Sequence, residues 1–185
     1  MPFFANNYFY IITIVLQAIC VLHCIENKVA LADAYLGAGH TNRAIELYEW
    51  SLDGNFEENE YVLSQLIIAY FQAKRFEEII PIAKKVYKRP QFARSKAHIL
   101  YAVALDYAGN SEMAESEFKT MKARFPNFEA RYQYGLFLIR TNRKEEARQL
   151  FAQMVDEAPH LSSQERSYNR SSIAQAKEEL RKMKV

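Results

Sequence analysis

Residues 27–49 read NKVALADAYLGAGHTNRAIELYE, and this stretch decides the fold of the chain. Ala32 and Tyr35 stand three positions apart in its first half, and Ala44 and Tyr48 stand four apart in its second half. Residues at this spacing share one face of an α-helix, and the GAGH run between them contains the glycines that favour a turn. The stretch therefore predicts two helices joined by a tight turn.

The same pattern recurs along the chain at a nearly constant interval. Its second-helix part returns at Ile79 and Ala83, Ala114 and Phe118, and Ala147 and Phe151, in steps of 35, 35 and 33 residues from Ala44. Its first-helix part returns at Leu66, Ile67 and Tyr70, at Tyr101, Ala102 and Leu105, and at Tyr134, Gly135 and Leu138. Small residues at these places let helices approach closely, and the aromatic residues fill the grooves between helices.

A period near 34 residues with two helices per unit resembles the tetratricopeptide-repeat family over roughly residues 26–161. The resemblance implies an all-α solenoid of about four helix–turn–helix repeats, at about 26–58, 60–93, 95–127 and 128–161. The sequence departs from the family in lacking Trp at the start of each repeat, where it has Lys28, Leu63, His98 and Arg131. Pro81 falls inside the second helix of the second repeat and predicts a kink or shifted packing there.

Residues 162–185 are polar, with apolar side chains at helical spacing, and predict a C-terminal capping helix. The apolar positions are Ile173, Ala176, Leu180 and Met183. A terminal repeat needs such a helix, which buries one face and shows water the other. Six basic and three acidic residues lie in this segment. They suit a solvated surface, or else an anionic lipid or acidic partner.

No charged residue occurs in residues 1–25, and residues 8–25 form an apolar run long enough to cross a bilayer as one helix. This run predicts one N-terminal transmembrane helix, contacting the lipid bilayer through residues 8–25. The alternatives are a buried core helix or the apolar first helix of the repeat array. The basic residues that follow the run favour a cytoplasmic side for the repeats.

The order of these segments also resembles bacterial membrane proteins in which a phospholipase D-nuclease-type transmembrane region precedes tetratricopeptide repeats. The stretch 27–49 and the stretch RSYNRSSIAQAKEELRKMK carry this resemblance. It implies an inner-membrane location. Such proteins have two spans and a linker, whereas here Ile25 is followed directly by Glu26. We therefore expect that an omitted second span and linker separate these two residues in a longer natural chain.

Motifs of enzymatic chemistry are absent from the sequence. It contains no phosphate-binding glycine loop, no H-E-x-x-H, no G-x-S-x-G and no H-x-K pair. Cys20, His23 and Cys24 lie within the apolar run, and no second ligand cluster accompanies them, so we expect no metal site. A net charge of +2 does not indicate a nucleic-acid partner. The sequence predicts neither an enzyme nor a cofactor.

The family's ligands lie along the concave face formed by the first helices, so the resemblance implies a groove on those helices. Its positions correspond here to Val29, Asp33 and Leu36, to Tyr61, Ser64, Ile68 and Phe71, to Lys96, Ile99, Val103 and Asp106, and to Glu129, Tyr132, Leu136, Ile139 and Arg140. This set is largely apolar and lacks the Lys and Asn clamp for a carboxylate. We expect a hydrophobic helix or an extended segment of a protein partner to bind there, unless some of these side chains are core.

Two functions remain open from the sequence. The leading one is a membrane-anchored scaffold that mediates protein–protein interaction, as an accessory or assembly subunit of a membrane complex. The alternative is a peripheral lipid-associated regulator that uses the basic C-terminal helix.

Overall fold

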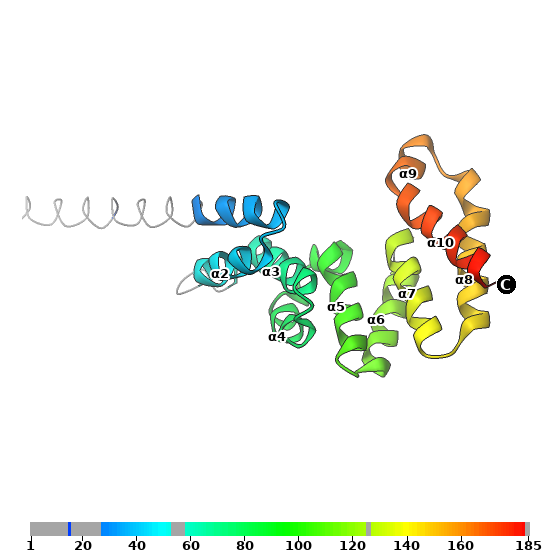
Figure 1. Cartoon of the computed structure of the whole chain (residues 1–185), viewed down its shortest axis with the longest axis horizontal. Coiled ribbons are helices and arrows are strands. Elements are labelled where there is room, and N and C mark those ends of the chain that lie inside the picture. Colours follow the sequence, from blue (N-terminus) through cyan, green and yellow to red (C-terminus); the bar gives the residue numbers. More distant parts are fainter. Residues whose placement is uncertain (1–14, 16–26, 53–57, 125–126, 184–185) are drawn as a thin grey trace, which may run out of the picture. The chain divides into compact units, whose positions relative to one another are not determined.

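The computed structural model describes residues 15, 27–52, 58–124 and 127–183, and in these ranges the chain is an all-α helical array (Figure 1). It divides into two compact units, Met1–Lys74 and Arg75–Val185. The boundary falls inside the second predicted repeat, after its first helix. The predicted membrane span of residues 8–25 lies outside the described residues except for Val15, and so does the junction between Ile25 and Glu26.

The first unit contains a helix over residues 27–37, α2 (Thr41–Ser51) and α3 (Glu60–Gln72). The helices α2 and α3 pack against each other. Asn59 caps α3 by accepting a hydrogen bond from the Val62 amide at 3.1 Å, which satisfies one of the free donors at a helix start. Ala32, Ala44 and Tyr48 are all fully buried, as the sequence pattern predicts.

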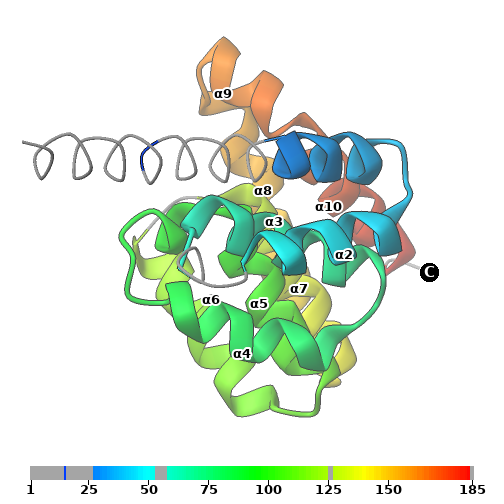
Figure 2. The same ribbon diagram turned by 90° about the vertical axis from the view of Figure 1, so that its left-hand side faces the viewer.

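The second unit contains most of the helices, in the order α4 (Phe76–Val86), η2 (Phe92–Arg94), α5 (Lys96–Tyr107), α6 (Ser111–Arg124), α7 (Phe128–Arg140), α8 (Lys144–Glu157), η3 (Ala158–His160), α9 (Ser163–Tyr168) and α10 (Arg170–Lys182). From α4 to α8 each long helix packs against the next, and α5 also contacts α7. Successive helices stack in an antiparallel manner (Figure 1, Figure 2). The first helix of the third repeat, α5, therefore lies beside the first helix of the fourth repeat, α7.

The turns inside the repeats share one backbone feature. Gly39, Lys74, Gly109 and Asn142 all have positive φ, of 81°, 60°, 81° and 63°, and they recur at the repeat period. In three of these turns the residue that follows the one with positive φ donates its amide to a carbonyl of the preceding helix. For example, the Asn110 amide donates to the Leu105 carbonyl at 2.8 Å. This is the arrangement that ends a helix with a left-handed residue. The glycine and asparagine turns were predictable from the sequence, whereas Lys74 was not.

The helices α7 and α8 approach each other closely at Gly135 on α7. A β-carbon built on this residue would lie 2.3 Å from two ring carbons of Phe151 on α8. Since Phe151 is fully buried, its ring occupies the space that a side chain at position 135 would need. The predicted role of this glycine in the helix crossing is therefore observed directly.

One local feature differs from the simplest prediction, whereas the kink or shifted packing predicted at Pro81 stays a prediction. The segment 162–185 contains two helices rather than one capping helix, because Asn169 interrupts it and its side-chain amide donates to the Glu165 carbonyl at 2.9 Å. Only α10 performs the capping role, by packing on α8 and α7 with Ala176 fully buried. In addition, α4 continues through Pro81, and Ile79 and Ala83 on either side of it are both fully buried.

Among the described residues, no helix is both long enough and apolar enough to cross a bilayer.

Candidate partner-binding surface

In the first unit the predicted groove residue Asp33 is a hydrogen-bond acceptor for two tyrosines. The Tyr48 hydroxyl donates to its Oδ1 at 2.5 Å, and the Tyr61 hydroxyl donates to its Oδ2 at 2.8 Å. Burial, followed by the hydrogen bond to Asp33, raises the pKa of Tyr48. Asp33 thus joins the helix of residues 27–37 to α2 and α3, and its carboxylate is committed to the fold.

The other predicted groove residues of the first unit keep part of their surface in solvent. Tyr61 is 52% exposed, although its hydroxyl is held by Asp33. The remaining members, Val29, Leu36, Ser64, Ile68 and Phe71, are half-buried. These side chains supply an apolar and aromatic surface on the first helices.

In the second unit two ion pairs connect the first helices of the third and fourth repeats. Lys96 and Glu129 lie at the starts of α5 and α7, with the amine 3.7 Å from the carboxylate. At the ends of the same helices, the Arg140 guanidinium donates to Asp106 through Nε at 2.7 Å and also contacts it through NH2 at 2.6 Å. Four predicted groove residues are therefore brought together in two pairs that align α5 with α7.

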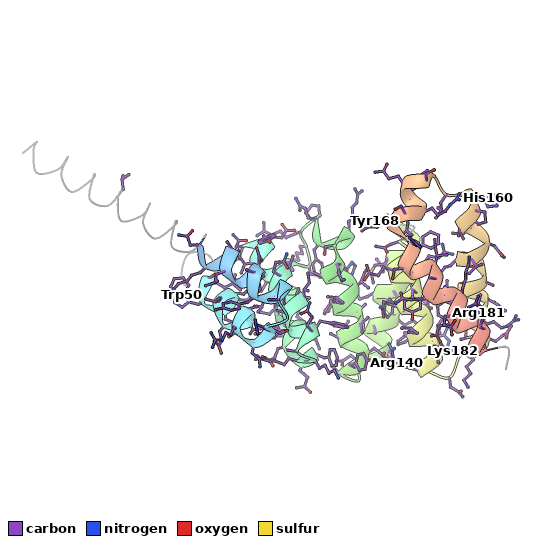
Figure 3. All side chains as sticks on the ribbon, turned by 45° about the horizontal axis from the view of Figure 1, so that its top comes forward. Trp50, Arg140, His160, Tyr168, Arg181 and Lys182 are labelled. Carbon is purple, nitrogen blue, oxygen red and sulfur yellow. The ribbon has the colours of Figure 1, made fainter. Side chains whose placement is uncertain are left out.

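An aromatic pair extends the Arg140 end of this surface. The Arg140 guanidinium lies 5.1 Å from the centre of the Tyr107 ring, and Tyr107 stacks on Phe76 at 4.5 Å with an interplanar angle of 12°. Figure 3 shows Arg140 at this end of α7. Tyr107 remains 54% exposed. A cation between a carboxylate and an exposed aromatic face can receive either an acidic or an aromatic group of a ligand.

The prediction that Ile99 and Val103 face an open groove is wrong, because each is only 2% exposed. All residues from Ala97 to Leu105 are buried, so α5 is surrounded on every side. A helix that is apolar all round belongs to the interior of an array. The sequence pattern did not predict the burial of Ile99 and Val103. A central repeat helix contacts neighbouring helices on more of its faces than a single amphipathic stripe indicates.

Ile99 nonetheless borders a hollow of about 330 Å³ at the start of α5 and α7. Its wall is formed by Ala93, Arg94, Ser95, Ile99, Met121, Asn127 and Ala130. The wall combines apolar residues such as Met121 with polar ones such as Ser95, and the volume falls at the lower end of the range for ligand sites, about 300–1,000 Å³. Lys96 and Glu129 stand next to wall residues in the sequence.

On α7 the predicted residues Tyr132, Leu136 and Ile139 are half-buried, and two of them approach the capping helix. Burial and then the charge of Glu179 raise the pKa of Tyr132, which places this ring near α10. Ile139 borders a second hollow of about 400 Å³ together with residues of α8 and α10, including Lys182.

Sequence reasoning did not identify a buried polar cluster around His98. The Nε2 atom of His98 lies 2.7 Å from Glu117 Oε2, and the Tyr87 hydroxyl donates to Glu117 Oε1 at 2.7 Å. Burial raises the pKa of Glu117, but the hydrogen bonds from His98 and Tyr87 outweigh this and leave it below its usual value. His98 stands where the family has Trp, and a polar residue at a packing position was the available signal.

The other two polar residues at these positions also find partners. Arg131 is 7% exposed and forms a bidentate pair with Glu157, in which NH2 lies 3.0 Å from Oε1. The amine of Lys28 lies over the ring of Trp50. Leu63 is fully buried. The residue that stands in place of the tryptophan thus makes a different kind of contact in each repeat.

Catalytic or metal chemistry finds no support in the described part of the chain. No group of three or more His, Cys, Asp or Glu there could hold a metal ion. The predicted absence of a metal site at Cys20, His23 and Cys24 concerns residues outside the described ranges. The polar clusters of this part of the chain instead connect helices, as His98 does with Glu117 and Arg131 does with Glu157.

A stack of helix pairs that aligns side chains along its first helices defines a repeat scaffold. The chain belongs to the tetratricopeptide-repeat family, whose match covers residues 29–93 and 101–162, more than half of the sequence. It is a tetratricopeptide-repeat scaffold for protein–protein interaction. The predicted resemblance to the tetratricopeptide-repeat family is therefore confirmed, whereas the resemblance to bacterial membrane proteins with a phospholipase D-nuclease-type transmembrane region stays a prediction.

Solved structures with the same fold include three of MamA. MamA MSR-1 C2 is 20% identical over 86% of this chain and 78% of its own, with a TM-score of 0.58. MamA AMB-1 P212121 is 25% identical over 70% of this chain and 76% of its own, with a TM-score of 0.60. MamA AMB-1 C2221 is 25% identical over 69% of this chain and 75% of its own, with a TM-score of 0.58. No curated protein matches the sequence.

Proposed function

We propose that this chain is a membrane-anchored tetratricopeptide-repeat scaffold that binds a protein partner on its first helices, as an accessory or assembly subunit of a bacterial membrane complex. The anchor in this proposal is the apolar run of residues 8–25. Its support is the absence of charge and the length of that run. The repeats lie on the cytoplasmic side, in accord with the basic residues that follow the run.

The observation that carries the binding proposal is the surface of α5 and α7 in the second unit. Lys96 with Glu129 and Asp106 with Arg140 align the two helices at both ends. Between these pairs the half-buried Leu136 adds apolar surface. Fixed polar ends around an apolar middle suit an extended or helical partner segment, whose apolar side chains lie along the helices and whose polar groups meet the ends.

Capture of the partner from native membranes tests the binding proposal. The full chain with a C-terminal affinity tag is purified in mild detergent beside the variant Leu136→Glu. Because Leu136 is half-buried, the new charge disturbs the surface with little effect on the core, and the partner is expected to be lost. Met113→Glu on α6 is the matched control, since Met113 is 51% exposed and lies on a second helix.

The outcomes separate the possibilities. Loss of the partner with Leu136→Glu and its retention with Met113→Glu support the proposed surface. Retention by both variants, or loss with Met113→Glu alone, contradicts it. Circular dichroism at 222 nm confirms that each variant keeps its helices.

The anchor is tested independently of the partner. The full chain and a chain lacking residues 1–25 are expressed with the same tag, and membranes are washed with alkaline carbonate. The full chain is expected to remain in the membrane pellet and the shortened chain to leave it. Release of the full chain by carbonate would refute the anchor while leaving the binding surface in place.

A further inference from the structure

The C-terminal end of the second unit contains a hollow that differs from the first-helix surface. It has a volume of about 390 Å³ and lies between the end of α8, η3, α9 and the first half of α10. Its wall combines the apolar residues Val155, Ala158, Pro159, Ile173 and Ala174 with the basic residues Arg166, Arg170 and Lys177. The described part of its wall contains no acidic residue.

The acidic side chains of α9 and α10 do not neutralise this basic rim, because each is engaged elsewhere. Glu165 forms the capping box with Ser162, accepting from the Ser162 amide at 3.0 Å. Glu178 pairs with Arg181 at 3.4 Å, and Glu179 pairs with Lys182 at 2.8 Å. These carboxylates are therefore engaged with Ser162, Arg181 and Lys182, none of which lines the hollow.

None of the three cations has a carboxylate partner within the described ranges. Neither Arg170 nor Lys177 makes an ion pair there. Arg166 is held by neutral acceptors, since its NH2 donates to the carbonyls of Pro159 at 2.9 Å and Leu161 at 3.1 Å. Its side chain is thereby fixed in place while its charge stays uncompensated. Three such charges around one apolar hollow create a local positive potential.

From this arrangement we infer that the hollow binds an acidic segment of a partner protein, with a bulky apolar side chain of that segment seated on Ile173 and Ala174. The apolar floor removes hydrocarbon from water, and the three cations pair with flanking carboxylates. Arginine suits the carboxylates because its guanidinium can bind both oxygens at once. This site is distinct from the α5 and α7 surface, so a scaffold could hold two protein segments.

The concave shape favours a peptide over a bilayer surface. A membrane is bound by apolar groups that protrude, and the floor of this hollow is recessed. Tyr168 does protrude, with 87% of its surface exposed, but it is not part of the wall (Figure 3). Binding to anionic lipid is accordingly treated as the competing outcome.

Fluorescence anisotropy with a defined peptide tests the inference on the full chain in detergent. The probe is fluorescein-labelled Asp-Glu-Asp-Leu-Phe-Asp-Glu-Asp, and its control peptide has Ser-Ser in place of Leu-Phe. We expect the first peptide to bind at least ~10-fold more tightly than the control, because only it fills the apolar floor.

Two variants locate the site on the protein. The double variant Arg170→Glu with Lys177→Glu reverses the rim and is expected to weaken binding at least ~10-fold. Ala174→Phe fills the hollow without changing charge, and because Ala174 is exposed it should fold normally and also weaken binding. The matched control is Arg181→Glu with Lys182→Glu, which makes the same charge change at the far end of α10 (Figure 3).

The affinities of these variants for the peptide decide whether the site exists. The site is supported if Arg170→Glu with Lys177→Glu and Ala174→Phe both lose affinity for the peptide, while the affinity of the control double variant stays within about twofold of wild type. Equal loss in both double variants would show that only net charge matters, and would overturn it. Failure of the apolar peptide to bind, together with phosphatidylserine vesicle binding that depends on Arg170 and Lys177, would overturn it in favour of a membrane surface.

Discussion

Replacing Gly135 by Ala should destabilise the second unit, although alanine is the better helix former. In the interior of a helix this exchange normally gains about 0.5–1 kcal/mol. Here the added β-carbon would lie 2.3 Å from Cε1 and Cζ of Phe151 and 3.1 Å from its Cδ1. Carbon atoms prefer a separation of about 3.5–4.0 Å, so two contacts are too short by more than ~1 Å.

The surrounding structure limits how far the Phe151 ring can move. The ring is fully buried and lies 5.8 Å from the ring of Tyr132. Overpacking of a core typically costs about 1–3 kcal/mol, and an overlap at two ring atoms belongs at the upper end. After the gain in helix propensity is subtracted, Gly135→Ala should lower the free energy of unfolding by about 2 kcal/mol.

Urea unfolding followed by circular dichroism at 222 nm measures this change. Gly37→Ala is the matched control, because a β-carbon built there meets nothing within 4 Å. It should change stability by no more than about 1 kcal/mol, in the stabilising direction. The same Gly135→Ala exchange in a Phe151→Leu background should lose most of its penalty, since the ring carbons are gone. A neutral or stabilising effect of Gly135→Ala in the wild-type chain would refute the close approach of α7 and α8.

Three further predictions concern a turn, a buried pair and a half-buried carboxylate. Lys74→Gly should raise the free energy of unfolding by about 1 kcal/mol in urea titrations, because φ is 60° there; a loss of stability would contradict this. His98→Ala should lower it by about 2–4 kcal/mol by leaving Glu117 buried with one fewer partner, and replacement of both residues by Leu should cost much less. The hydrogen bond from Arg143 lowers the pKa of Glu115 from 4.5 to about 2. Stability from this group is therefore present above about pH 4.5 and lost as the pH falls toward 2, by about 1 kcal/mol after allowance for solvent screening. Thermal unfolding between pH 6 and pH 2 should show this loss in the wild type and not in Glu115→Gln.

The helical repeats and most of their turns could be predicted from the sequence because they depend on local chemistry. Spacing such as that of Ala44 and Tyr48 recurs with the repeat, and both residues are fully buried. Glycine at positions 39 and 109 permits the positive φ that each turn requires. These effects act within a few residues, so periodicity and residue type are sufficient to predict them.

Whether an individual side chain faces solvent or the core was decided by the tertiary structure. Ile99 and Val103 occupy positions that line a groove in the family, yet here they are buried, because α5 packs against α4, α6, α7 and η2. Asp33 likewise serves two tyrosines rather than a ligand. Which residues contact a given side chain depends on how successive helices stack, and no local sequence pattern determines that stacking.

The sequence by itself determined that this protein is a tetratricopeptide-repeat array, since the period of its small and aromatic residues requires paired helices. Only the tertiary structure decided what the polar residues in the tryptophan positions do: His98 pairs with Glu117, and Arg131 pairs with Glu157. The physical reason is that a buried polar group must find a partner, and the partner is supplied by a helix 19 or 26 residues further along the chain.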